Sequence, residues 1–158
     1  MNQNNKVSLI DYCIPCKARC CKTGKLIGSP ILSNKEAGRI GKNNLKKVKF
    51  PKGEYWVIKE QQSTNRCFFL NKQNKCKLQN LKPLDCLCYP IKAVYEKDLI
   101  RFITDSDCPA SSFLNKEFIR ESKKIAIKSI KRFDRETYQH WLDNYVGWVR
   151  KTIKLNKV

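Results

Sequence analysis

The sequence predicts an α+β protein, a small single domain in which a cysteine-rich loop and strand region is braced by helices near the C-terminus. All nine cysteines lie between residues 13 and 108, together with short aromatic and β-branched runs that are typical of strands. From residue 112 onward cysteines are absent, and apolar residues recur with helical spacing. We therefore interpret residues 1–158 as one domain, with a cysteine-cluster region over 12–109 and a helical segment over 112–155.

Ser33 and Glu36 mark the start of the first predicted helix. A serine followed three residues later by glutamate is the capping-box pattern, and we expect this helix to run towards Gly41. Strands are expected at residues 55–59 (YWVIK) and 67–70 (CFFL), because aromatic and β-branched side chains favour extended backbone.

A hairpin and two helices complete the expected fold. Residues 91–95 and 99–104 are predicted to pair across a turn at 96–98, and Asp134 is expected to cap the second helix. The apolar stripes of the two helices are Leu114, Phe118, Ile125, Ile130 and Phe133, then Trp141, Tyr145 and Trp148. We interpret the aromatic stripe as core or a docking face, and the single histidine, His140, as a core residue rather than a metal ligand.

The chain is strongly basic, with 33 Lys and Arg against 14 Asp and Glu and a formal net charge of +19. Such a charge attracts nucleic acid or an acidic partner. The alternative is the compositional bias of an AT-rich genome. We favour the alternative, because the lysines are spread from Lys6 to Lys157 and do not form one block.

The N-terminal residues 1–12 lack the apolar stretch of a signal peptide, and no apolar run approaches the roughly 20 residues that span a bilayer. We therefore expect a cytoplasmic protein with no membrane association. In a reducing compartment clustered thiols bind metal or do redox work more often than they form disulfides. The odd number of cysteines also fits poorly with a fully paired disulfide framework.

The cysteines form two clusters in the sequence. The first, Cys13-x2-Cys16-x3-Cys20-Cys21, begins with a spacing that can turn two sulfurs onto one metal ion. The adjacent pair at its end suits two metals, or one ligand and one reactive thiol, because neighbouring side chains diverge. The second cluster contains Cys67, Cys76, Cys86, Cys88 and Cys108, each beside turn residues. Pro83 is expected to stop any helix before Cys86.

These motifs resemble the YkgJ-type CxxCxxCC cysteine-cluster family, which is described as a zinc- or iron-chelating domain. The similar stretches are C-x2-C-x3-C-C, C-F-F-L, C-x-L-x3-K-P-x2-C-x2-Y-P and C-P, within residues 12–109. Lys82 stands where the family has one arginine, and Leu87 replaces a second. The spacing between Cys16 and Cys20 is one residue longer than in the family's name pattern.

The resemblance implies eight metal ligands and leaves out Cys88, which falls on a variable position. The implied ligands are Cys13, Cys16, Cys20, Cys21, Cys67, Cys76, Cys86 and Cys108. The family also includes flagellin lysine N-methylases, for which an iron–sulfur cluster and methyl transfer from S-adenosylmethionine are implied. Those enzymes are longer, and this chain has no Gly-rich nucleotide loop.

Thiolates in sets of four suit tetrahedral zinc and iron–sulfur clusters, so the expected cofactor is zinc or iron, an iron–sulfur cluster included. Eight ligands divide into two four-cysteine sites, or one cluster plus zinc, and sequence order does not say which thiols share a site. We favour a metal-binding protein whose metal is structural, stored or delivered. An iron–sulfur enzyme that modifies a protein, for example by lysine N-methylation, and a basic zinc module that binds nucleic acid remain open.

No catalytic residues are predicted. With one histidine in the chain, neither a Ser-His-Asp nor a Cys-His set is recognisable near the cysteines. The acids closest to the cysteines in sequence, Asp85, Asp105 and Asp107, are interpreted as turn or cap residues.

Overall fold

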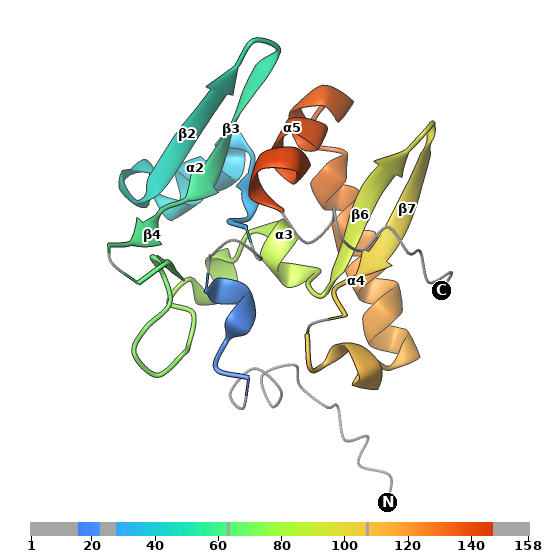
Figure 1. Cartoon of the computed structure of the whole chain (residues 1–158), viewed down its shortest axis with the longest axis horizontal. Helices are drawn as coiled ribbons and strands as arrows, with labels where there is room; N and C mark the ends of the chain where they lie inside the picture. Colours follow the sequence, from blue (N-terminus) through green and yellow to red (C-terminus); the bar gives the residue numbers. More distant parts are fainter. Residues whose placement is uncertain (1–15, 23–27, 63, 107, 147–158) are drawn as a thin grey trace, which may run out of the picture.

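Helices and small antiparallel sheets alternate along the chain in the computed structural model, which describes residues 16–22, 28–62, 64–106 and 108–146 (Figure 1). The predicted α+β class is confirmed. In the described part of the chain, no helix combines the length and the apolar character needed to cross a bilayer.

The first half of the chain forms a three-stranded antiparallel sheet. β3 (Gly53–Ile58) lies in the middle, with β1 (Ile31–Leu32) and β2 (Leu45–Phe50) on its two sides. The strand expected at 55–59 corresponds to β3. Sequence reasoning missed β2, because its three exposed lysines interrupt the apolar alternation that identifies a strand.

The helix expected after Ser33 is α2 (Asn34–Ile40), and its capping box is present. The Ser33 side chain accepts a hydrogen bond from the Glu36 N–H, and the Glu36 carboxylate accepts one from the Ser33 N–H at 3.0 Å. Gly41 ends the helix with a φ of 91°, a conformation that favours glycine. The short 3-10 helix η2 (Lys42–Asn44) then leads into β2.

The strand expected at residues 67–70 is wrong beyond its first residue. β5 (Arg66–Cys67) pairs with β4 (Glu60–Gln61), and the chain then turns, with the Leu70 N–H donating to the Cys67 carbonyl at 2.9 Å. Leu70 next forms a single antiparallel bridge with Cys76. Phe69 and Leu70 are buried, so this apolar run places a turn in the core rather than extending a strand.

The hairpin is confirmed as β6 (Ile91–Glu96) and β7 (Leu99–Thr104), which pair from Ile91 with Thr104 to Glu96 with Leu99. After η4 (Ser111–Phe113) come α4 (Lys116–Ile130) and α5 (Arg135–Tyr145). Asp134 caps α5 as expected, since its carboxylate accepts the Thr137 N–H at 2.7 Å.

The stripe predicted for the first of these helices needs correction. α4 packs on β6 and α3 (Leu84–Leu87) with small residues, and its buried positions are Ser122, Ala126, Ser129 and Ile130. Phe118 and Ile125 are only half-buried. Small side chains allow a helix to approach its neighbours closely, and a search for large apolar residues overlooks them. Trp148 of the second stripe lies outside the described residues.

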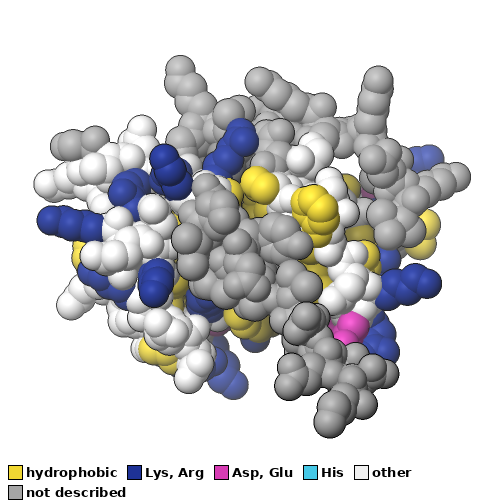
Figure 2. All heavy atoms as spheres, turned by 90° about the horizontal axis from the view of Figure 1, so that it is seen from below, with side chains coloured by type: hydrophobic (Ala, Val, Ile, Leu, Met, Phe, Trp, Pro, Cys, Tyr) yellow, Lys and Arg dark blue, Asp and Glu magenta, His cyan; other side chains and the backbone are white. Residues whose placement is uncertain are grey.

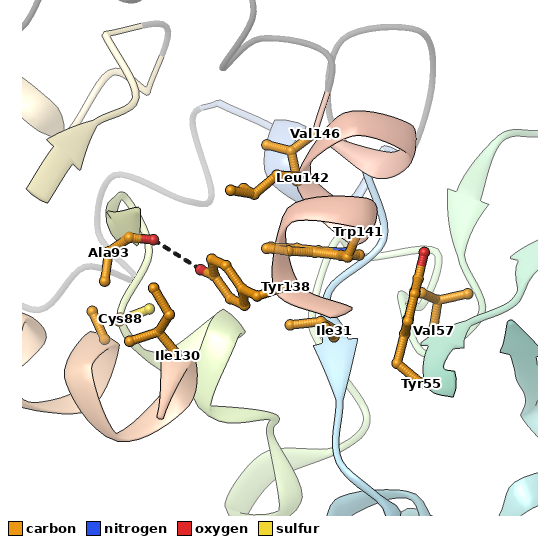
Figure 3. Packing of buried hydrophobic residues seen from close by; sticks show 11 residues of the cluster. Ile31, Tyr55, Val57, Cys88, Ala93, Ile130, Tyr138, Trp141, Leu142 and Val146 are labelled. Atoms are coloured by element: carbon orange, nitrogen blue, oxygen red, sulfur yellow. Dashed lines mark hydrogen bonds between the residues drawn. The ribbon is translucent and has the colours of Figure 1, made fainter. Parts of the chain in front are cut away.

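The core divides into two clusters. The larger joins α5, α4, β3 and β6, and ten of its residues are labelled in Figure 3. At its centre the Tyr138 hydroxyl donates to the Ala93 carbonyl at 2.9 Å, and Trp141 lies beside Tyr138 with ring centroids 5.1 Å apart. The smaller cluster lies under α2 and β5 and contains Cys67, with Cys21 and Cys76 packed against it.

Basic side chains are spread over the described surface that Figure 2 shows. Figure 2 shows Lys and Arg side chains spread over one face, with little acidic surface between them. On the first sheet, Lys42 and Lys47 each lie 5.6 Å from the Trp56 ring centre, and Lys47 also pairs with Glu54 at 2.6 Å. The positive charge therefore does not gather on a single element.

Candidate metal centre

The predicted ligands come from several elements. Cys20 and Cys21 lie in the 3-10 helix η1 (Arg19–Cys21), Cys67 in β5, and Cys86 in the short helix α3. The expectation that turns present the ligands holds for Cys76, which follows the turn closed by the Asn71 N–H and the Lys75 carbonyl at 2.9 Å. It also holds for Cys67, whose carbonyl accepts the Leu70 N–H across the turn that follows β5, whereas Cys86 lies within a helix. Cys13 lies outside the described residues.

Pro83 was expected to stop any helix before Cys86, but in the structure it also begins one. The 3-10 helix η3 (Gln79–Leu81) ends before it, and Pro83 itself is the N-cap of α3, which carries Cys86. Its ring fixes φ near −57° and its missing N–H is not needed at a helix start. The proline therefore begins the helix that positions Cys86.

Glu36 holds the first turn of α3 from a distance of 48 residues in the sequence. One oxygen of its buried carboxylate accepts the Leu84 N–H at 2.9 Å and pairs with Arg132 at 2.7 Å. The other accepts the Ser33 N–H and hydroxyl, both at 3.0 Å. Burial opposes ionisation of Glu36, but these donors and the Arg132 charge outweigh it and hold its pKa below the ordinary value.

A buried ion pair fixes the far side of α3. Lys92 and Asp85 lie 2.5 Å apart, both less than a tenth exposed, and Lys92 also lies 4.3 Å from the Trp141 ring centre. The interpretation of Asp85 as a turn or cap residue is therefore wrong. Asp85 is half of an ion pair that joins α3 to β6 and α5. Pairing satisfies both charges, which would be costly to bury alone.

Four of the predicted ligands form what we call the first thiol group: Cys21, Cys67, Cys76 and Cys86. Cys21 and Cys76 pack against the cluster that contains Cys67. Burial, and then the charges of Cys21 and Cys76, raise the pKa of Cys67 to about 12. Burial, Asp85 and then the charges of Cys21, Cys67 and Cys76 raise the pKa of Cys86 well above its ordinary value. Cys21, Cys67 and Cys76 therefore share one cluster, and Cys86 lies within electrostatic range of all three.

Cys86 is exposed as a residue, although burial of its thiol is the first cause of its raised pKa. Both statements hold because solvent reaches part of the residue while protein atoms crowd the sulfur. The neighbouring charges act in the same direction, so the increase does not depend on burial alone.

Cations lie beside this group. The pKa of Cys21 is lowered, first by a hydrogen bond from Cys20 and then, against the effect of burial, by the charges of Lys82 and Arg66. In the described part of the chain, the Arg66 Nε is buried and has no hydrogen-bond partner, while its NH2 group donates to Asn71 and Asn74. Arg66 and Lys82 therefore place positive charge beside Cys21.

Three further predicted ligands are described, and one of them, Cys20, adjoins this group, with its sulfur 4.0 Å from that of Cys21. Cys20 and Cys108 both act electrostatically on Tyr89, and Cys16 lies just before η1. The turn expected at residues 105–107 is present, since the Cys108 N–H donates to the Asp105 carbonyl at 3.2 Å, although Asp107 itself is not described. Asp105 is more than a turn residue, because its buried carboxylate accepts the Tyr89 hydroxyl at 2.5 Å.

The sequence analysis left Cys88 and His140 out of the predicted ligands. In the structure both residues lie outside these groups. Cys88 is 1% exposed in the larger core cluster beside Ile130, and its thiol donates to the Asp85 carbonyl at 3.4 Å (Figure 3). The His140 ring stacks on Phe50 and its Nδ1 lies 3.0 Å from the Tyr55 hydroxyl.

Among the described residues, no three His, Cys, Asp or Glu side chains are drawn together tightly enough to form a completed metal site. No disulfide joins the described cysteines to one another. No family model, curated protein or solved structure matches the chain. The family resemblance therefore rests on the cysteine motifs alone.

Sequence reasoning missed the residues that support the cysteines. Glu36 was recognised only as a cap of its own helix, and Lys92 and Tyr89 only as parts of a strand and a motif. Arg66 had no recognised role. Each acts on residues that tertiary folding brings to it, and no local pattern marks such a partner. The sequence signal that could have identified Lys92 is a charged residue within the apolar strand IKAVYE.

Proposed function

We propose that this protein binds zinc or iron through its cysteine thiolates, as a metal-binding protein of the cysteine-cluster type. The observation that carries the proposal is the first thiol group. Its four thiols come from η1, β5, the bridge after the 71–75 turn, and α3, which are as much as 65 residues apart in sequence. Separate segments that each deliver one thiol to one place are typical of a four-cysteine metal site.

The donor type and the surrounding charge support the same proposal. Four thiolates suit tetrahedral zinc and iron–sulfur clusters, both of which bear net negative charge when bound to four cysteines. Lys82 and the buried Arg66 Nε–H offset such a charge and can donate to sulfur. The resemblance to the YkgJ-type family adds the remaining cysteines as ligands.

The four thiols do not form a complete metal site in this structure, and metal binding would complete it. The thiols lie near one another without a common ligand arrangement, so coordination draws η1, β5 and α3 together. Thiols lose their protons on binding metal, which reverses the raised pKa values of Cys67 and Cys86. The expected role of the ion includes stabilising the smaller of the two core clusters, which contains these thiols.

Elemental analysis and an absorption spectrum of protein purified without oxygen test the proposal. We expect bound zinc, or iron with sulfur-to-iron visible absorption, at one ion or cluster per chain or more. Cys86→Ser should lower the metal content, whereas Cys88→Ser, a change in the apolar core only two residues away, should leave it unchanged.

Both variants need a fold check by circular dichroism, because Cys88 is buried. A folded wild-type chain that retains no metal, and takes up none from added zinc or ferrous iron, would refute metal binding. Equal metal loss in folded Cys86→Ser and Cys88→Ser would refute this ligand assignment.

A further inference from the structure

The outer face of the first sheet carries a tryptophan among lysines. Residues paired across antiparallel strands point to the same face of a sheet, and β2 and β3 pair Lys47 with Trp56. Two residues further along β2, Lys49 lies on that face as well, opposite Glu54. Lys42 joins them from η2, since Lys42 and Lys47 each lie 5.6 Å from the centre of the Trp56 ring. We call Lys42, Lys47, Lys49 and Trp56 the Trp56 platform.

The Trp56 platform is open to solvent. Its three lysines are exposed and Trp56 is half-buried. On the opposite face of β3, in contrast, Tyr55 and Val57 are buried in the larger core cluster. β2 is an edge strand of its sheet and lies at the outside of the molecule (Figure 1). A partner can therefore contact the lysines and the indole together.

The Trp56 indole is held in a fixed orientation. Its Nε1–H donates to the Asn34 side-chain oxygen at 2.8 Å, at the start of α2. The ring also packs against the smaller core cluster. A ring that is already fixed loses little conformational freedom when a flat group stacks on it, so the platform is preorganised for stacking.

Positive charge from several elements surrounds the platform. Residues 34–59 contain eight Lys and Arg, all exposed, against two Glu. One of the two, Glu36, is buried and paired with Arg132. The other, Glu54, lies 2.6 Å from Lys47, but both side chains are at least a third exposed, and such a pair is held only weakly. The surface therefore attracts a polyanion.

We infer that the Trp56 platform binds single-stranded nucleic acid, with a base stacked on Trp56 and phosphates on the surrounding lysines. A basic surface with an aromatic ring that stacks a base is typical of proteins that bind single strands. Alternate residues of a β-strand lie roughly 7 Å apart, so Lys47 and Lys49 can contact neighbouring phosphates of an extended strand. This function goes beyond metal binding, since no thiol belongs to the platform.

Two other polyanions fit the platform less well. A duplex presents phosphates to the lysines, but its bases are stacked on one another inside the helix and leave the indole unused. An acidic peptide presents carboxylates and has no base to stack. Only a single strand uses the charge and the ring together.

Fluorescence anisotropy of a labelled oligothymidylate with the full-length protein tests the inference. Wild type should bind the single strand more tightly than a duplex of the same length. The triple variant Lys42→Gln, Lys47→Gln, Lys49→Gln should bind the single strand about tenfold more weakly or worse. The slope of log affinity against log salt should become shallower by about 2, since each phosphate contact on a single strand contributes about 0.7.

A second triple variant is the matched control, because it removes the same charge elsewhere. Lys116, Lys124 and Lys128 are exposed on α4, and their replacement by Gln lowers the net charge equally. Charges remote from the bound strand are screened by salt, so this variant should lose less than about threefold in affinity. If both triple variants lose the same affinity, the strand binds to the overall charge and the inference is overturned.

Trp56 separates stacking from charge. Trp56→Leu removes the aromatic ring but keeps an apolar side chain against the core. It should weaken oligothymidylate binding about 5–100-fold and leave the salt slope unchanged. Trp56→Phe should keep most of the affinity, because a phenyl ring still stacks with a base. Circular dichroism checks the fold of each variant, and a folded Trp56→Leu with wild-type affinity would overturn the stacking role.

Two further results would overturn the inference. The first is wild-type protein that binds no oligothymidylate at low salt. The second is wild-type protein that binds polyglutamate or the duplex as tightly as the single strand, with no effect of Trp56→Leu on any of them. Preference for polyglutamate would identify an acidic protein segment as the partner.

Discussion

At the scale of single residues, the carboxylate of Glu36 joins more of this fold than any sequence motif suggested. It caps its own helix, accepts the Leu84 N–H at the start of α3, and pairs with Arg132 just after α4. The ion pair with Arg132 requires the ionised form, and the two hydrogen bonds are stronger with it. One side chain thus couples the position of Cys86 to the C-terminal helices, and Glu36 becomes a residue whose charge can be tested.

Glu36→Gln should destabilise the fold by about 1–3 kcal/mol at neutral pH, because a buried carboxylate with several donors is replaced by a neutral amide. The folded pKa of Glu36 lies below its ordinary value of 4.5, so the ionised group stabilises the fold fully above that pH. This contribution is lost as the pH falls through the folded pKa. The difference between wild type and variant, measured by urea denaturation, should therefore shrink below about pH 4.5.

Glu60→Gln is the matched control, since Glu60 is exposed on β4 and should change stability by less than about 0.5 kcal/mol. If the difference in stability between wild type and Glu36→Gln stays constant from neutral pH to pH 3, the charge-based explanation is wrong.

At the scale of elements, α5 depends on the extended segment that precedes β1. The Trp141 indole N–H donates to the Ser29 carbonyl at 2.9 Å, and the Ser29 hydroxyl donates to the Ile58 carbonyl at 2.8 Å. Gly28 passes so close to the last residue of α5 that an added Cβ would lie 0.9 Å from the Tyr145 carbonyl oxygen. Backbone meets backbone here, so a side chain cannot be accommodated by a rotamer change.

Gly28→Ala should therefore destabilise the protein by about 3 kcal/mol or more, because α5 or the 28–30 segment must shift. Gly38→Ala is the matched control. Gly38 is an exposed position in α2 with nothing within 4 Å of an added Cβ, and alanine there should stabilise by up to about 1 kcal/mol. Thermal or urea denaturation measures both, and equal effects would mean that the close approach of Gly28 and Tyr145 does not constrain the fold.

At the scale of the whole molecule, the two core clusters differ in their relation to the cysteines. The larger contains Tyr138, Trp141 and Cys88, and aromatic and aliphatic packing fills it. The smaller contains Cys67 and borders Cys21 and Cys76. α3 links the two, with Cys86 on one side and the Asp85–Lys92 pair on the other.

Removing metal should therefore loosen one part of the protein more than the other. After chelation, amide hydrogen exchange should become about tenfold faster or more in η1, β5 and α3, while α5 keeps its protection. Mass spectrometry of peptides from each region measures this. Equal acceleration across α5 and β5 would contradict the separation of the two cores, and no change in either would mean that metal, if bound, does not support the fold.

Much of the fold could be predicted from local sequence patterns. The capping box at Ser33, the hairpin at 91–104 and the Asp134 cap each depend on residues within a few positions of one another, and all three are present. The predictions that failed concern residues whose environment is not local. Phe69 and Leu70 lie in a turn that enters the core, not in a strand. The serines of α4 are buried because β6 and α3 approach the helix closely.

For the candidate site, the sequence by itself determined the available donor chemistry, which is nine thiols and a single histidine. Only the tertiary structure decided which thiols lie together. It packs Cys21 with Cys67 and Cys76, which are 46 and 55 residues away, and it places His140 among aromatic residues and Cys88 in the apolar core. The physical reason is that side-chain type is a local property, whereas proximity is set by how sheets, turns and α3 bury their apolar faces against one another.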